Sequence, residues 1–131
     1  MFIKYSELEE KAKNSLDLSL IVDEKIISAK IAISTEEKEK GLAGIEDLPQ
    51  LQGMLFCYEK PTIANFWMKG VIMPRLGILF LNNKGEVVGK ETMTSENPTL
   101  ICSSQKPINY ALELNPEIIE DIRLGDMVKR F

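Results

Sequence analysis

The sequence LGILFLNNKGEVVGKETMT at residues 76–94 decides the fold class. Two stretches rich in Ile, Leu and Val flank the polar loop NNKG, in which Asn and Gly tolerate the positive φ angles that a tight turn requires. This pattern predicts a β-hairpin. Similar short apolar stretches predict further strands at residues 18–23, 25–34, 53–59, 64–70, 108–114 and 125–131.

The N-terminal stretch YSELEEKAKNSL, residues 5–16, has the spacing of a short amphipathic helix. Ser6 and Glu9 are spaced as a capping box, which predicts a helix start there. The apolar stripe is narrow and docks either on its own domain or on a partner, so both interpretations stay open. Its candidate partner-docking residues are Tyr5, Leu8, Ala12 and Leu16.

Two further short helices are expected. Ser34 and Glu37 form a second capping box, and residues 36–40 are interpreted as a solvated helical face. Asn115 and Pro116 suit the N-cap and first position of another helix. The chain is therefore predicted to be mainly β, a compact β-barrel or β-sandwich with about three short helices. Residues 1–17 are the N-terminal helical segment and residues 18–131 a single β-rich domain.

The composition of the chain argues against nucleic acid and membranes as partners. The formal net charge is −4 over 131 residues, which provides no basic surface and argues against nucleic acid. The sequence has no signal-peptide pattern and no apolar run near the length of a membrane helix. We expect a soluble cytoplasmic protein with no membrane partner.

The sequence contains no histidine. Ser-His-Asp and Cys-His catalysis are therefore excluded, and two cysteines alone do not make a usual zinc site. No metal and no cofactor are expected. Cys57 and Cys102 lie in or beside apolar stretches, where a reduced, buried thiol is the commoner state. Whether the two cysteines lie close together stays open.

Six segments in order resemble the domain of unknown function 192 family. They are EEKEKGLAG, GMLFCY, FWMKGVIMP, ILFLNNKGEVV, INYALELN and IRLGDMV, within about residues 27–130. The resemblance implies a small, mainly β fold and little biochemistry, because the family's activity is not established. Its members include exported bacterial proteins and proteins encoded in phage genomes, so the resemblance implies no single role.

This chain departs from the family pattern after its Phe-Trp-Met-Lys motif. The family usually continues Asn-Thr and, after Pro, Leu-Asp, whereas Gly70 and Val71 follow the motif here, and Arg75 follows the proline. If the family's polar residues form a site, this chain lacks the amide, the hydroxyl and the carboxylate. The resemblance therefore implies no catalytic residues in this segment.

The candidate ligand-binding residues are Trp67, Lys69 and Arg75. Trp67 and its neighbour Phe66 should point to opposite faces of a strand, with Phe66 in the core and Trp67 at a cleft or interface. Lys69 and Arg75 flank this pair and suit an anionic group. Glu113 lies between two leucines and is expected near the interior, in a structural salt bridge or a hydrogen bond to a loop.

The sequence leaves three candidate functions open. The first is a non-enzymatic accessory protein that acts through protein contacts or self-assembly, as a component of a larger assembly such as a phage particle. The alternative is a domain that binds a small carbohydrate or anion at Trp67. The third is a hydrolase that uses Glu113 or Asp126, which the missing histidine places last.

Overall fold

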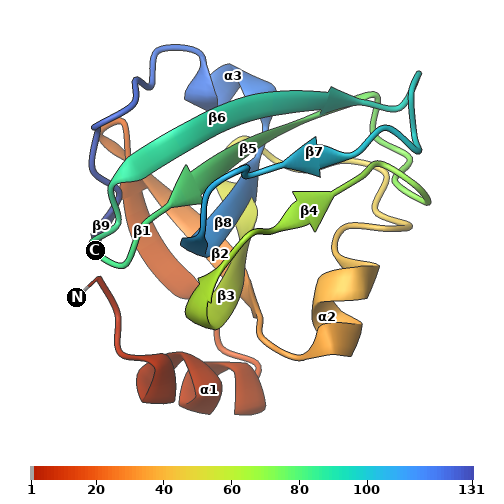
Figure 1. Cartoon of the computed structure of the whole chain (residues 1–131). Helices are drawn as coiled ribbons and strands as arrows, with labels where there is room; N and C mark the ends of the chain where they lie inside the picture. The colour runs from red at the N-terminus through yellow and green to blue at the C-terminus, as the bar shows by residue number, and fades with distance from the viewer. Residues whose placement is uncertain (1) are drawn as a thin grey trace.

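The computed structural model describes residues 2–131 and is built around a curled seven-stranded sheet (Figure 1). The strands of this sheet are β1 (Leu18–Val22), β2 (Lys25–Ala32), β3 (Gln52–Thr62), β5 (Arg75–Leu81), β6 (Val87–Thr94), β8 (Ile108–Leu114) and β9 (Lys129–Arg130). Their order is β6-β5-β8-β3-β2-β1-β9, and every pair is antiparallel except β2 with β3. The mainly β prediction is confirmed, and the sheet forms a half-barrel.

A short two-stranded ribbon and the helices cover the sheet. The ribbon consists of β4 (Asn65–Phe66) and β7 (Cys102–Ser103). The helices are α1 (Tyr5–Lys13), α2 (Thr35–Lys40) and α3 (Pro116–Ile119). No helix within residues 2–131 is both long enough and apolar enough to cross a membrane. We call the face packed against α1 and α3 the helix-covered face and the face packed against β4 the ribbon-covered face.

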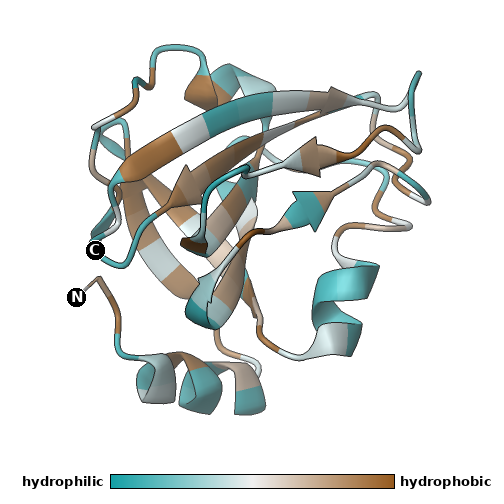
Figure 2. Ribbon diagram, viewed as in Figure 1, coloured by the Kyte–Doolittle hydropathy of each residue, from teal (hydrophilic) through white to brown (hydrophobic). Residues whose placement is uncertain are grey.

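Each face of the sheet has its own hydrophobic core. On the helix-covered face, Leu79 and Leu112 pack with Leu8 of α1 and Ile119 of α3. Because successive side chains of a strand point to opposite sides, their neighbours point to the ribbon-covered face. There Phe56, Phe66 and Phe80 form an aromatic cluster, with 5.1 Å between the first two ring centres. Figure 2 shows the hydrophobic colour along β5 and the hydrophilic colour over α2.

The two ends of the sheet meet on one side of the molecule. Glu86, before β6, forms an isolated antiparallel bridge with Met127, before β9. The Val87 N–H donates to the Asp126 carbonyl at 2.8 Å, and the Val128 N–H donates to the Gly85 carbonyl at 2.8 Å. These bonds pair backbone groups that would otherwise lie at open sheet edges. The rest of β6 keeps an edge that no strand of the sheet covers.

Some of the helix and strand predictions are confirmed, and others are wrong. The hairpin at residues 76–94 is confirmed as β5 and β6, and the Ser34 and Glu37 capping box is present. The capping box at Ser6 and Glu9 is wrong, because the N-cap of α1 is Lys4, two residues earlier, and Lys4 has no side-chain hydrogen bond. The two strands predicted around KPTI are also wrong in extent. β3 continues through residue 62, and β4 has two residues.

The N-terminal helix docks on the core of its own chain. Leu8 is fully buried in the helix-covered core, and Tyr5 and Ala12 pack against that core. Three candidate partner-docking residues are thus occupied within the molecule. Leu16 lies beyond the end of α1 with 53% of its surface exposed, because the apolar stripe does not continue past the helix.

Lys90 of β6 holds the chain that follows α3. Its Nζ donates to the carbonyls of Ile119 at 2.8 Å, Glu120 at 3.1 Å and Ile122 at 2.8 Å. A Lys90→Met variant leaves these carbonyls without this charged donor, so we expect it to lower the free energy of unfolding by about 1–3 kcal/mol. Urea denaturation measures this change. Lys84→Met, in the exposed hairpin turn, is the control, and an equal effect of both would contradict the anchoring role.

Candidate ligand-binding site

A cavity of about 420 Å³ opens between α2 and the ribbon-covered face of the sheet. Its volume lies in the range of small-molecule sites. α2 contributes Lys38 and Lys40, β3 contributes Tyr58, and β8 contributes Glu113. Trp67 and Lys69 come from the turn after β4. We call this the Trp67 cavity.

Trp67 presents an aromatic surface at the mouth of the cavity. The side chain is 47% exposed, whereas that of the preceding Phe66 is buried in the aromatic cluster. The prediction that this pair divides between core and cleft is confirmed. Lys69 extends over the indole, with its Nζ 5.3 Å from the ring centre. This cation–π contact keeps a positive charge beside the aromatic surface.

Lys38 supplies a second positive charge from the opposite wall. Its Nζ lies 4.0 Å from the ring centre of Tyr58, and partial burial of the ammonium group lowers its pKa. The interpretation of residues 36–40 as a fully solvated face is therefore wrong for Lys38, which is half-buried. The sequence gives little indication of the partial burial of Lys38, because a lysine in a short polar helix is usually a surface residue. The tyrosine that holds it is distant in the chain.

Within residues 2–131, none of the lysines that line the cavity forms a salt bridge, and Glu39 lines the cavity beside them. Both ion pairs found within residues 2–131 lie elsewhere in the molecule. The ammonium groups of Lys38, Lys40 and Lys69 thus line the cavity without a salt bridge. They give it a positive potential that a small anion can use.

Arg75 does not belong to this site, which corrects the prediction that it flanks the aromatic pair. It begins β5 and lines a different cavity with Glu46, Asp47 and Glu117. The segment between Trp67 and Arg75 contains a turn in which Gly70 has a φ of 81°. This turn separates residues that are near each other in sequence. Lys69 lines the same cavity as Trp67, whereas Arg75 lines a different one.

Among residues 2–131, Glu113 is the one titratable carboxyl that is buried. It is 4% exposed, and burial raises the pKa of its carboxyl to about 8. The expectation of a structural salt bridge or a hydrogen bond to a loop is wrong. Within the part of the chain that the structure describes, no ion pair involves this carboxyl, and burial is the sole cause of its pKa shift. The small exposed part of the side chain lines the Trp67 cavity.

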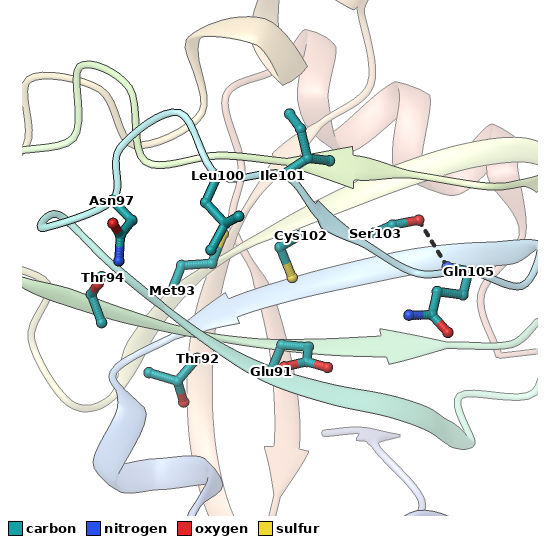
Figure 3. Close-up of a pocket in the computed structure, with 10 residues that line it drawn as sticks. All are labelled: Glu91, Thr92, Met93, Thr94, Asn97, Leu100, Ile101, Cys102, Ser103 and Gln105. Atoms are coloured by element: carbon teal, nitrogen blue, oxygen red, sulfur yellow. Dashed lines mark hydrogen bonds between the residues drawn. The ribbon is translucent and has the colours of Figure 1, made fainter.

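A second, smaller cavity of about 240 Å³ lies between β6 and β7 (Figure 3). Glu91 and Cys102 face each other across it, and Leu100 and Ile101 expose apolar side chains at its rim. Burial, followed by the charges of Glu91 and Glu113, raises the pKa of the Cys102 thiol to about 11. The thiol is therefore protonated and weakly nucleophilic at neutral pH.

Asp126 and Cys57 lie apart from both of these cavities. Asp126 accepts a hydrogen bond from the Arg123 N–H at 2.9 Å in the turn before β9. Cys57 and Cys102 are free thiols that pack with different cores, Cys57 with the helix-covered core and Cys102 with the ribbon-covered core. Residues 2–131 contain no group of three His, Cys, Asp or Glu side chains placed to hold a metal ion.

Fold and cavity together define a small half-barrel domain with a site of small-molecule size on one face. The family model DUF192, described as "Uncharacterized ACR", matches residues 19–130. The chain belongs to this family, and α1 lies outside the matched range. No curated protein matches the sequence.

Two solved structures share this fold. One is a protein from Sinorhizobium meliloti 1021 provisionally assigned as a transcription regulator, with a TM-score of 0.78 and 24% identity over 87% of this chain and 92% of that chain. The other is a protein of unknown function from Novosphingobium aromaticivorans DSM 12444. Its TM-score is 0.77, with 23% identity over 87% of this chain and 84% of that chain. At these identities the likeness shows the fold alone.

Proposed function

We propose that this protein is a small-ligand binding domain, and that its ligand has a ring that stacks on Trp67. One observation carries the proposal: a half-exposed tryptophan and three lysines without salt bridges line one cavity of about 420 Å³. An aromatic face with a few polar groups around it is the usual composition of a site for a carbohydrate or other cyclic ligand.

Trp67 is the sole tryptophan of the chain, so its fluorescence reports directly on this cavity. We expect titration with D-glucose, D-glucuronate, benzoate or glucose 6-phosphate to change this fluorescence in a saturable way. By calorimetry, Trp67→Ala should bind the same probe at least about tenfold more weakly, because the stacking surface is gone.

Ile72→Ala is the matched control, since Ile72 is also exposed and close in sequence but does not line the cavity. It should bind as the wild type does. Binding that Trp67→Ala leaves unchanged, or no binding of any of the four probes by the wild type, would overturn the proposal. Circular dichroism of both variants establishes that each is folded.

The other functions receive less support. A glycoside hydrolase uses two carboxyls that act on one substrate. Of the two predicted carboxyls, Glu113 lines the Trp67 cavity and Asp126 does not, and the other carboxyl at this cavity is Glu39, on the exposed side of α2. The provisional assignment of the relative as a transcription regulator is not transferred, because a net charge of −4 provides no basic surface for nucleic acid.

Protein contact is the second candidate function. The observation that favours it is the apolar pair Leu100 and Ile101 beside the uncovered edge of β6, which can add a strand of another chain. A Leu100→Asp, Ile101→Asp double variant should lose any stoichiometric partner captured by the wild type from native lysate. Equal capture by both would contradict a contact at this edge.

A further inference from the structure

Glu113 occupies an unusual position in the sheet. It pairs with Ile78 of β5 on one side and with Met54 of β3 on the other, so aliphatic and thioether side chains flank it. Paired residues of neighbouring strands point to the same face, and this row projects from the ribbon-covered face. The two strand neighbours of Glu113 are therefore apolar, and its side chain borders the Trp67 cavity.

Within residues 2–131, no fully enclosed side-chain oxygen lacks a hydrogen-bond partner, so the Glu113 carboxyl at the Trp67 cavity is open to a partner from that cavity. Burying a polar group without a hydrogen bond costs free energy, and a buried charge costs more. Within residues 2–131, no salt bridge compensates Glu113. Since the pKa of this carboxyl is about 8, the group is mainly protonated at neutral pH and can donate a hydrogen bond into the cavity.

We propose that the ligand of the Trp67 cavity is a small cyclic oxyanion, and that the protonated carboxyl of Glu113 donates a hydrogen bond to it while the lysines balance its charge. This inference rests on the proposed function and adds the chemical class of the ligand. A protonated carboxyl donates to an oxyanion, whereas a carboxylate at the same place would repel it. Ligand binding is thereby linked to one proton.

Other titratable groups lie near Glu113, and their charges contribute to the electrostatic potential of the cavity. Tyr58 and Cys102 are neutral at physiological pH, because burial raises the pKa of each. The charged side chains are Lys38, Glu39 and Lys40 of α2, Lys69 of the turn, and Glu91 and Lys30, which lie further along the same row of the sheet. Below the pKa of Glu113, this set carries an excess of positive charge, which favours an anion.

The test measures the affinity for D-glucuronate against pH, with D-glucose as the neutral probe of the same ring. For the wild type, we expect a constant dissociation constant between about pH 6 and pH 7.5, then roughly tenfold weaker binding per pH unit above pH 8. Glu113→Gln keeps an N–H donor but does not titrate, so its affinity should change less than about twofold between pH 6 and pH 9. D-glucose should show no such dependence with either protein.

Glu91→Gln is the matched control, since it removes a carboxyl from the same row of the sheet but from another cavity. It should keep the wild-type pH profile. Glucose 6-phosphate in parallel shows whether the oxyanion is a phosphate or a carboxylate, and saturable binding of either supports the inference. Identical pH profiles for the wild type and Glu113→Gln would overturn it.

The test also separates this inference from the proposal on which it rests. Wild-type binding of D-glucose without binding of either oxyanion would overturn the assignment of the ligand class and leave the binding function standing. No binding of any probe would overturn both. A direct titration of the Glu113 carboxyl by carbon-13 NMR gives its protonation state without any ligand.

Discussion

Glu113→Gln is expected to abolish most of the pH dependence of stability in this protein between about pH 5 and pH 8. The carboxyl has an ordinary pKa of 4.5 and a pKa of about 8 in the folded protein. The folded state therefore keeps a proton that the unfolded chain releases. The resulting contribution to stability is fully present below pH 4.5, declines by about 1.4 kcal/mol per pH unit as the pH rises, and is lost above the folded pKa.

The glutamine side chain is neutral at every pH and nearly isosteric with the protonated acid. At about pH 4.5 the variant and the wild type should have similar free energies of unfolding, and at about pH 9 the variant should be more stable by up to 4–5 kcal/mol. Urea denaturation at a series of pH values measures both. Glu91→Gln removes an exposed carboxyl and should follow the wild type. A wild-type advantage at pH 9 would show that the Glu113 carboxylate has a compensating partner.

Leu8→Ala should produce the second large effect, a loss of about 2–5 kcal/mol in the free energy of unfolding. Leu8 is fully buried where α1 packs on the helix-covered core, and truncation leaves a cavity there. The segment before α1 is also attached to β8. The Tyr110 hydroxyl donates to the Ile3 carbonyl at 3.0 Å, and the Phe2 ring packs edge-on against Tyr110 at 5.2 Å.

Leu16→Ala is the control for this measurement. Leu16 carries the same side chain in the same N-terminal segment, but it is 53% exposed, so its loss should cost less than about 0.5 kcal/mol. Chemical denaturation of both variants compares them directly. Equal effects would mean that α1 leaves the core in solution, and the helix would return as a candidate docking element for a partner.

Local signals in the sequence predicted most of the elements correctly. The NNKG turn, the Ser34 capping box and the Asn115 N-cap each depend on residues within one turn of chain, and all are present. The prediction ends this strand at residue 59 and takes KPTI, which contains Pro61, as the connection to the next strand, whereas β3 continues through Thr62. The structure places this proline in the part of β3 beyond its regular pairing with β8, where a missing N–H is tolerated.

The site was harder to predict than the fold. The local sequence predicted that Phe66 and Trp67 divide between core and cleft, because this division depends on strand alternation alone. Lys38 and Glu113 could not be placed with Trp67, because they come from α2 and β8, which are distant from this residue in the sequence. Arg75 was wrongly included in the predicted site because it is close to Trp67 in the sequence. The turn at Gly70, however, directs the chain away from the cavity.

The single parallel pair of the sheet has a consequence for the evolution of binding specificity. Parallel neighbours cannot be joined by a tight turn, so the chain must cross over between β2 and β3, and residues 33–51 make this crossing. The crossover carries α2, and α2 is the wall of the Trp67 cavity that strand pairing does not position. Its sequence can therefore diverge while the half-barrel is retained. Exchanging residues 33–51 between members of the family would be a direct route to domains with the same scaffold and different ligands.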